Sequence, residues 1–262
     1  KGSNLTLQEG KASTFTLIPM NTKHPVLKKK KIRQALQYAI NGKELIDNVY
    51  RGAGEQVESI FPPWHPAFTK ASDLSAIRQN VSKAKKLLQE EGYGPGGNQL
   101  KLTMLHGNGG AHVQRAVLIQ AQLKAVGVEL SIVKSKMGAL LKQMYTGKYE
   151  MALWQMLGGP TIQDYTWNMY HSGGSNNPSG YNKDGGYQNP EAEKLLNEIV
   201  KTNDPAVAKP NLIKLQNIIF EDVPVIFANW RNHRTARNSW VKNFKTGKLK
   251  GMEDLREVWI DK

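Results

Sequence analysis

The sequence contains no cysteine, and none of its apolar runs approaches the roughly 20 residues that a transmembrane helix needs. The absence of cysteine excludes disulfide bonds, thiolate metal ligands and a cysteine nucleophile. Hydrophobic residues still make up 39% of the 262 residues. That is enough to fill the core of one large domain or of two small ones, so we expect a globular protein.

Acidic residues are scarce relative to basic ones, with 22 Asp and Glu against 36 Lys and Arg and a net charge of +14. Basic chains often bind nucleic acid, anionic lipid or cell-wall polymers. The only tight basic cluster runs from Lys28 to Lys31, and no nucleic-acid-binding motif accompanies it. We therefore expect a solvated basic surface without nucleic-acid binding, and we keep a basic polyanion-binding module as an alternative.

Signatures of catalysis and of cofactor binding are also missing. The sequence has no nucleophile elbow, no HExxH pair and no glycine-rich phosphate-binding pattern. Its six histidines are widely spaced, so a metal site formed within this chain is not expected. We predict no enzyme activity, no cofactor and no metal site.

The middle of the chain predicts the fold class. Three short aliphatic runs read as strands: Leu100 to His106, Val128 to Lys134 and Tyr149 to Met156. Amphipathic helices are expected between them, at Ala111 to Val126 and Met137 to Thr146, and each is followed by a glycine. Strands joined by helical crossovers lie parallel, so the pattern predicts a βαβαβ unit in an α/β domain.

Ligands of open α/β sheets tend to bind beyond the carboxyl ends of the strands. In this chain those ends are His106 to Gly110, Ser135 to Met137 and Trp154 to Asp164. The last is the richest in functional side chains, and it is therefore the first place to look for a site.

The N-terminal part predicts a polar lead-in, Lys1 to Ser13, and then a strand, Thr14 to Asn21. Because that strand contains a proline, we expect it to be an edge or crossing strand. A helix over Ile32 to Ile40 is followed by Asn41, which is a good N-cap for a second helix over Gly42 to Tyr50.

The C-terminal part contains three strand-like pieces after Phe227, at Arg234 to Asn238, Trp240 to Phe244 and Leu255 to Ile260. They have no obvious partners in the βαβαβ sheet. We expect this tail either to be poorly packed or to pair with the strand that begins at Thr14.

The run KKIRQALQYAINGKELIDNVYRGAGEQVESIFPPWHPAF, which begins at Lys30, resembles the family 5 extracellular solute-binding proteins of ABC importers. That family has a VRQALxxAID pattern, then a glycine-containing turn and a proline-rich segment. Asn41 stands where the family usually has Asp, and Asn can also cap a helix.

Further stretches agree with the family in the same order. Ser82 to Gly94 resembles the family's KAKALLAEAGY helix, with Ser82 as the expected cap and Gly92 as the stop. Gln120 to Glu129 resembles its QAQLKKIGI helix end, and Gly147 to Met156 its YDxxxxGW strand. Tyr170 to Leu196 resembles its YxNPEvDkLL segment, and Ile218 to Ile226 its final strand motif.

The resemblance implies a periplasmic-binding-protein-like lobe, an α/β fold with a mixed sheet flanked by helices. Family members have two lobes that close around a ligand at a hinge. This chain would correspond to the C-terminal half: residues 1–22 as lead-in and hinge-crossing strand, 23–228 as the second lobe, and 229–262 as a tail returning to the missing first lobe. Because the chain begins at Lys1 rather than Met, we expect a processed or truncated product.

The resemblance also implies a function. The protein would be an extracytoplasmic component of an ABC importer, lipid-anchored in its full-length form and monomeric, that captures peptides and delivers them to a membrane permease. The same fold binding an oligosaccharide or another small solute remains an alternative.

For the ligand site, the family places a tryptophan near Met156, and Trp154 lies two residues earlier. Peptide-binding relatives carry an Asp after this strand, where the present chain has Gly158 and Gly159. Asp164 is a candidate to replace it, although an Asp before a helix is often an N-cap.

Four further residues complete the expected ligand-binding set: Tyr165, Trp167, Asn229 and Trp230. For the aromatic residues the alternative is a position in the core, and an oligosaccharide would use them as stacking surfaces.

The Gly- and Asn-rich segment from Gly173 to Gly186 is expected to be a surface loop that folds over the ligand.

Overall fold

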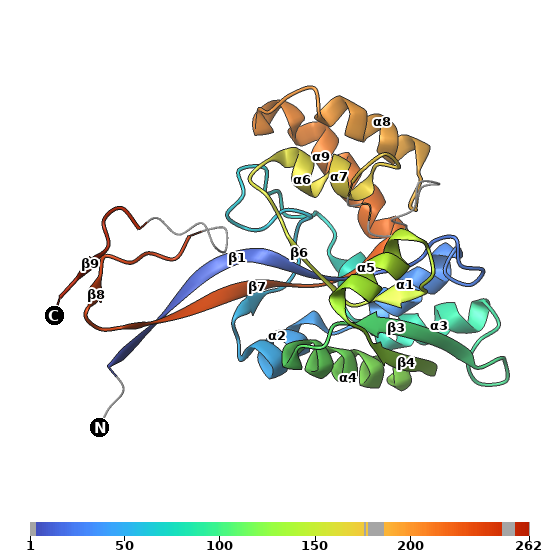
Figure 1. The fold of residues 1–262 in the computed structure, drawn as a ribbon. Coiled ribbons are helices and arrows are strands. Elements are labelled where there is room, and N and C mark those ends of the chain that lie inside the picture. The colour runs from blue at the N-terminus through green and yellow to red at the C-terminus, as the bar shows by residue number, and fades with distance from the viewer. Residues whose placement is uncertain (1–3, 176, 178–185, 248–254, 262) are drawn as a thin grey trace.

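Two long strands run through the body of the molecule, and their far ends project from it. They are β1 (Leu5–Pro19) and β7 (Val225–Asn238), which pair antiparallel from Leu5↔Asn238 to Pro19↔Val225. In the computed structural model, which describes residues 4–175, 177, 186–247 and 255–261, the far ends of this pair project from the body (Figure 1). The short strands β8 (Val241–Lys242) and β9 (Trp259–Ile260) pair with each other near those far ends.

The pairing of β1 corrects two expectations. The strand begins at Leu5, so most of the expected polar lead-in is part of it. It is also a central strand, because the sheet has the order β2-β7-β1-β6, with β2 at Gly54–Glu55 and β6 at Trp154–Leu157. Pro19 is tolerated because it is the last residue of the strand. Of the three expected tail pieces, Arg234 to Asn238 pairs with β1, at Leu5 to Glu9, whereas the pieces around β8 and β9 pair with each other.

A second sheet contains the predicted parallel strands. The strands β3 (Leu100–His106) and β4 (Val128–Lys134) pair in parallel over seven residues and have the predicted bounds. Between them lies α4 (Gly110–Ala125), and Gly127 follows it with a φ of 88°, a left-handed value that favours glycine.

The third predicted strand is divided between the two sheets. Only β5 (Met151–Ala152) pairs in parallel with β3. After Leu153 the chain enters β6, which pairs antiparallel with β1. The prediction of a single βαβαβ sheet is therefore wrong beyond Ala152. The hydrophobic periodicity could not reveal this, because an apolar run has the same pattern in either sheet. One chain segment thus connects the two sheets.

Helices cover both sheets (Figure 1). On the β3–β4 side, α3 (Val81–Glu90) begins after Asn80, whose side chain accepts the Lys83 N–H. The predicted cap, Ser82, lies inside this helix. The other helices are α1 (Lys30–Ala39), α2 (Gly42–Tyr50), α5 (Met137–Tyr145), α6 (Ile162–Tyr165), α7 (Trp167–Tyr170), α8 (Pro190–Ile199), α9 (Pro205–Asp222) and the 3-10 turn Ser75–Ile77.

Arg33 on α1 anchors the junction between α9 and β7. Its guanidinium donates to the carbonyl oxygens of Asp222 (2.7 and 3.0 Å) and Val223 (3.1 Å), and to those of Leu27 and Lys28. Val223 has a φ of 46°, which is unusual for a β-branched residue. The arginine of the IRQAL motif therefore satisfies the carbonyl groups that this turn leaves unpaired.

Two large apolar clusters lie on opposite sides of the first sheet. One contains Phe15, Trp230 and Tyr165 and is covered by α6 to α9. The other contains Ile18 and Leu36 and continues onto β3, β4 and α4. Within the described part of the chain, no helix combines the length and apolarity needed to cross a membrane.

Candidate functional site

The strand β6 forms one border of the site. It pairs with β1 from Leu17↔Trp154 to Thr14↔Leu157, and among the described strands none pairs with its other edge. An open edge of this kind can accept an extended chain through backbone hydrogen bonds. β6 ends at Leu157, and Gly158 and Gly159 follow it directly.

A side chain at either glycine would meet a residue of α6. A Cβ atom on Gly158 would lie 2.0 Å from the Tyr165 hydroxyl oxygen, and one on Gly159 would lie 2.1 Å from Asp164 Oδ2. Neither distance is possible for real atoms. An Asp at position 159 would therefore occupy the space that the Asp164 carboxylate fills.

The Asp164 carboxylate is held by the turn that starts α6. Its Oδ2 atom accepts the Thr161 N–H at 3.0 Å and the Thr161 hydroxyl at 2.6 Å, while Thr161 Oγ1 accepts the Asp164 N–H. Thr161 is the N-cap and Asp164 the third helical residue, so an N-cap role for Asp164 is wrong. The Oδ1 atom accepts no hydrogen bond from the described residues, and Asp164 is partly exposed.

Trp154 and Met156 lie on the same face of β6, as their alternation predicts. Met156 is buried opposite Phe15, and Trp154 is partly buried between two apolar clusters. Trp154 therefore keeps some exposed surface next to the open edge of β6.

Besides Met156, three of the expected site residues lie in the core. Trp230 is fully buried and stacks on Phe15 with ring centroids 4.3 Å apart. Tyr165 is 1% exposed and Asn229 is 0% exposed, with the Asn229 amide donating to the Trp230 carbonyl. Their predicted ligand contacts stay predictions, and the contacts seen here support the walls of the site from behind.

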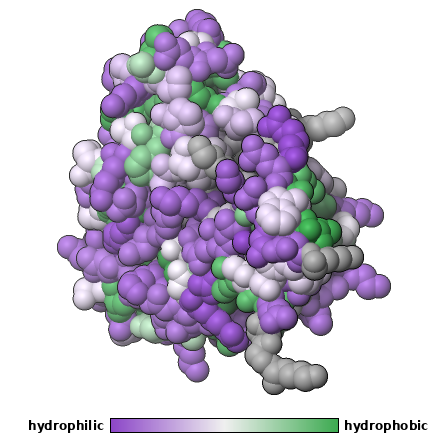
Figure 2. All heavy atoms as spheres, turned by 90° about the vertical axis from the view of Figure 1, so that its left-hand side faces the viewer, coloured by the Kyte–Doolittle hydropathy of each residue, from purple (hydrophilic) through white to green (hydrophobic). Residues whose placement is uncertain are grey.

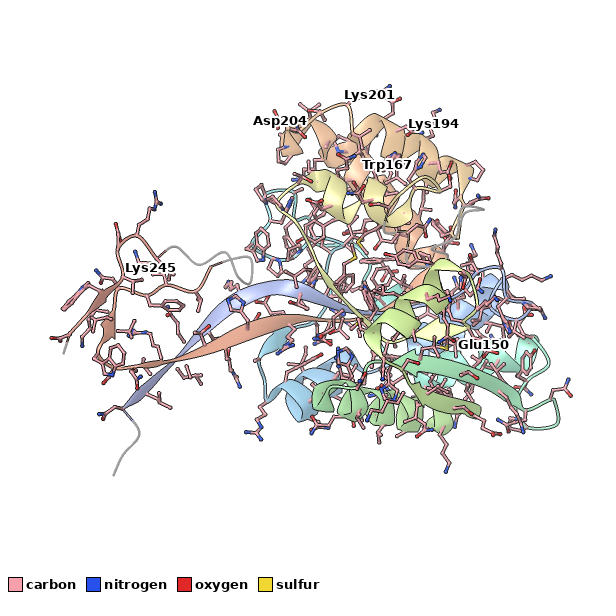
Figure 3. The ribbon with its side chains drawn as sticks, in the orientation of Figure 1. Glu150, Trp167, Lys194, Lys201, Asp204 and Lys245 are labelled. Carbon is pink, nitrogen blue, oxygen red and sulfur yellow. The ribbon has the colours of Figure 1, made fainter. Side chains whose placement is uncertain are left out.

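Trp167 is directed toward α8. Its indole N–H donates to Asn197 Oδ1 at 3.3 Å, and its ring stacks on His171. Figure 3 shows Trp167 among the α6–α9 helices, away from β3 and β4. Trp154, Tyr165 and Trp167 consequently do not form one open aromatic surface. Most of the loop from Gly173 to Gly186 lies outside the described residues.

A positively charged cluster beside β1 was not predicted from the sequence. The guanidinium carbons of Arg115 on α4 and Arg231 on β7 lie 5.9 and 5.4 Å from the centre of the Tyr50 ring. His112 is close enough that both arginines influence it, after burial as the main cause, and its pKa is lowered to about 4. The two arginines come from distant parts of the chain, and His112 shares α4 with Arg115. The sequence offered only one signal for this cluster, an inward-facing arginine in the apolar stripe of a helix.

Most of the predicted basic cluster is neutralised. Lys29, Lys30 and Lys31 form ion pairs with Glu91 (2.9 Å), Glu221 (2.7 Å) and Glu90 (2.9 Å). These pairs reduce the charge that a polyanion could contact. Within the ranges that the structure describes, no group of three or more His, Cys, Asp or Glu residues is placed to hold a metal ion.

The open edge of β6 and the Asp164 carboxylate next to it are the features of this surface that a ligand could contact. The sequence model of the bacterial extracellular solute-binding proteins, family 5 (middle region), matches residues 1–178. The chain therefore belongs to the family 5 extracellular solute-binding proteins, which are not enzymes.

Individual relatives agree with this assignment. The chain is 26% identical to the oligopeptide-binding protein AppA of Bacillus subtilis over 273 aligned residues, which cover 100% of this chain and 50% of the relative. It is 28% identical to the glutathione-binding protein GsiB of Shigella flexneri over 86% of this chain and 44% of that protein. The chain spans about half the length, or less, of the curated relatives it matches.

Solved structures share the fold. B. subtilis AppA in complex with a nonapeptide superposes with a TM-score of 0.84 and 24% identity, covering 99% of this chain and 53% of that one. DppA of Helicobacter pylori, in complex with the peptide STSA, gives a TM-score of 0.85 and 22% identity, covering 99% and 49%. The periplasmic-binding-protein-like fold is thus confirmed.

Proposed function

We propose that this chain is the C-terminal lobe of an extracytoplasmic peptide-binding protein that delivers its ligand to an ABC permease. One observation carries the proposal: the Asp164 carboxylate lies over Gly159, at the end of the open β6 edge, with Oδ1 free of hydrogen bonds from described residues. A peptide offers matching groups, namely a backbone that can extend β6 and a cationic α-amine for the carboxylate.

Asp164 replaces, from within α6, the carboxylate that peptide-binding relatives carry directly after the strand. Gly159 leaves the space for this carboxylate, and Gly158 leaves the space for the Tyr165 ring behind it. The names of the relatives, which bind oligopeptides, dipeptides and glutathione, support a peptide ligand. The domain division at residues 22 and 228, a second lobe supplied by upstream sequence, and hinge closure between the lobes belong to the same proposal.

An oligosaccharide is less well supported. Stacking on sugar rings needs exposed aromatic faces, but Tyr165 is 1% exposed and Trp167 is covered on one face by His171. A polyanion-binding role is also less well supported, because most of the Lys28–Lys31 cluster is engaged in ion pairs.

The test is a titration of the chain with tri-alanine, in which binding is monitored through the backbone amide signals of residues 154–164 in NMR spectra. We expect saturable shifts, and about tenfold weaker binding when the tri-alanine is N-acetylated or when Asp164→Asn removes the charge. Asn can still accept the Thr161 N–H, so the α6 turn should persist. Maltotriose serves as the sugar arm. Equal binding of acetylated and free tri-alanine, or saturation with maltotriose alone, would overturn the proposal.

A further inference from the structure

Two arginines meet at one tyrosine without a carboxylate between them. Arg115 reaches the Tyr50 ring from α4, and Arg231 reaches it from β7. In Figure 1 the first turn of α4 lies beside α2, on the side from which β1 and β7 project. The Tyr50 hydroxyl is shared between Gln155 Nε2 at 3.3 Å, Thr16 Oγ1 at 3.2 Å and an interaction with Arg115. A neutral tyrosine lies between the two guanidinium groups and does not neutralise their charge.

Arg115 is the more deeply buried arginine of the pair, since it is 1% exposed, and its charge is therefore the more costly to bury. Its Nε–H donates to the Ala111 carbonyl at 2.9 Å, but its Nη1 is buried without a hydrogen-bond partner among the described residues. Burial is the main cause that lowers the pKa of this guanidinium, the Tyr50 side chain raises it, and Arg231 lowers it further. A buried charge whose hydrogen-bonding capacity is only partly used is costly, so an ion or a polar group that completes it would be favoured.

Arg231 is half-buried, and its guanidinium lies over the Tyr50 ring without an ion pair to any of the described residues. Two other arginines are well paired: Arg33 donates to four carbonyl groups, and Arg234 pairs with Glu9 at 2.8 Å. Arg237 also has an unpaired Nε, but its Nη1 donates to the Val241 carbonyl. What distinguishes Arg115 and Arg231 is that two guanidinium groups meet at one ring.

The described groups around the pair supply no negative charge to neutralise it. The first turn of α4 contains no acidic residue, and its N-cap, Gly109, has no side chain to cap it. His112 and His106 lie nearby. The acids on the adjoining α2 are engaged elsewhere, since Glu44 accepts from Gln122 at 2.7 Å and Asp47 pairs with Lys43.

Two fixed charges exceed what one carboxylate neutralises. We infer that Arg115 and Arg231, with the first turn of α4, form a subsite for a dianionic group, either a phosphate or two neighbouring carboxylates, carried by the bound solute. The inference rests on the proposed function and narrows its substrate class to strongly acidic peptides or similar solutes. Guanidinium groups suit both oxyanions because they bind them with paired, charge-assisted hydrogen bonds.

The subsite lies within reach of a ligand on β6. Arg231 is the β-partner of Thr14, and Thr14 is the partner of Leu157, the residue before Gly158. Two strand spacings are about 10 Å, which an extended peptide covers in about three residues. The pair lies on the side of the sheet where Gln155 of β6 contacts the Tyr50 hydroxyl at 3.3 Å, and Asp164 lies on the other side. A short acidic solute at the open edge of β6, where the two sides meet, could contact both.

The test compares anions at constant ionic strength and at a pH of about 7.5, using the whole 262-residue chain. Inorganic phosphate and succinate are the dianionic probes, and acetate is the monoanion. Binding is followed by calorimetry and by the NMR titration of the His112 ring. We expect both dianions, or one of them, to bind about tenfold more tightly than acetate and to raise the pKa of His112. Phosphate binding alone would assign a phosphoryl ligand, and succinate binding alone would assign paired carboxylates.

Arg231→Gln should weaken dianion binding about tenfold, because it removes one of the two charges. Arg234→Gln is the matched control on the same strand and should change nothing. Arg115→Gln is a second variant, and thermal unfolding shows whether each variant is folded. Equal affinity for acetate and the dianions, or no effect of Arg231→Gln in a folded variant, would overturn the inference.

Two peptides separate this inference from the proposed function. If tri-alanine and Ala-Glu-Glu bind equally well and Arg231→Gln affects neither, the peptide function stands and the dianion subsite fails. If the dianions bind but neither peptide does, the subsite stands and the peptide function fails. Tighter binding of Ala-Glu-Glu that depends on Arg231 supports both.

Discussion

Gln37 on α1 pairs with the backbone of Phe227 on β7 as a neighbouring strand would. Its Oε1 accepts the Phe227 N–H at 2.7 Å, and its Nε2 donates to the Phe227 carbonyl at 3.4 Å and to the Ile77 carbonyl at 3.2 Å. Gln37 is fully buried. β2 pairs only with Trp230 and Arg231, so Gln37 extends the satisfied edge of β7 by one residue.

Replacing Gln37 with leucine should therefore destabilise the fold. Leucine has a similar volume but leaves the Phe227 N–H and carbonyl unpaired, which costs about 1–3 kcal/mol for each buried group. We expect a loss of about 2–4 kcal/mol in the free energy of unfolding, measured by urea denaturation. Gln143→Leu, on the exposed side of α5, is the control, because Gln143 Nε2 makes only a long 3.5 Å contact. Equal effects of the two substitutions would contradict the role of Gln37.

The two glycines after β6 should differ in their tolerance of alanine. At Gly158 the added methyl would overlap the buried Tyr165 ring, and we expect a loss of about 3 kcal/mol or more. At Gly159 it would displace the end of one carboxylate, and we expect about 1–2 kcal/mol, the value of a lost helix cap. Ligand binding should fall in the Gly159→Ala variant even where the protein remains folded. A fully active Gly159→Ala variant would show that the Asp164 position is not needed.

Stability should fall as the pH decreases from about 6.5 to about 4. Burial, Arg115, His106 and Arg231 lower the pKa of His112 to about 4, whereas an unfolded histidine titrates near its ordinary value. In this window the unfolded chain binds the additional proton, so lowering the pH favours unfolding. We expect a loss of about 2 kcal/mol from His112, reduced from the full linkage value because the ring is partly exposed.

His112→Gln should remove most of that pH dependence, as measured by urea denaturation at several pH values. The remaining slope should come from His65, whose pKa is lowered chiefly by burial while its ring nitrogen contacts the Pro160 carbonyl at 3.1 Å. An unchanged slope in the His112→Gln variant would show that this ring does not control the acid sensitivity.

The start of α3 offers a test of helix capping. Asn80 accepts the Lys83 N–H at 2.9 Å, and Ser82 is inside the helix and exposed. Asn80→Ala should lower the melting temperature through a loss of about 1 kcal/mol, and Ser82→Ala should be neutral or slightly stabilising. The reverse order would restore Ser82 as the cap.

Local patterns identified many elements because local chemistry determines them. The strands Leu100–His106 and Val128–Lys134, the helix Gly42–Tyr50 and its cap Asn41 were all predictable from periodicity and capping. The transfer of the chain at Leu153 from one sheet to the other was not, because it depends on where β1 lies. Pro19 suggested an edge strand, but a proline at the end of a central strand removes no essential hydrogen bond.

The site was predictable only in part for the same reason. Asp164 and Trp154 were candidates because they follow a strand, but the overlap between Gly159 and Asp164 is a tertiary contact. Tyr50, Arg115 and Arg231 are separated by long stretches of sequence, and each looks like an ordinary core or surface residue by itself. Burial of Trp230 and Asn229 could not be distinguished from cleft exposure by the alternation of β7 alone.

The face from which β1 and β7 project is mainly hydrophilic, with hydrophobic atoms in separate small areas (Figure 2). Along this pair the number of strands changes: near Thr14 and Arg231 the flanking β2 and β6 make a four-stranded section, whereas from Gly10↔His233 to Leu5↔Asn238 only the two strands pair. Resistance to bending therefore drops sharply between Thr14 and Gly10, where the register also shifts. A load applied to the far end of this ribbon would be absorbed there as twist and flexure, leaving the geometry around Asp164 and Arg231 undistorted.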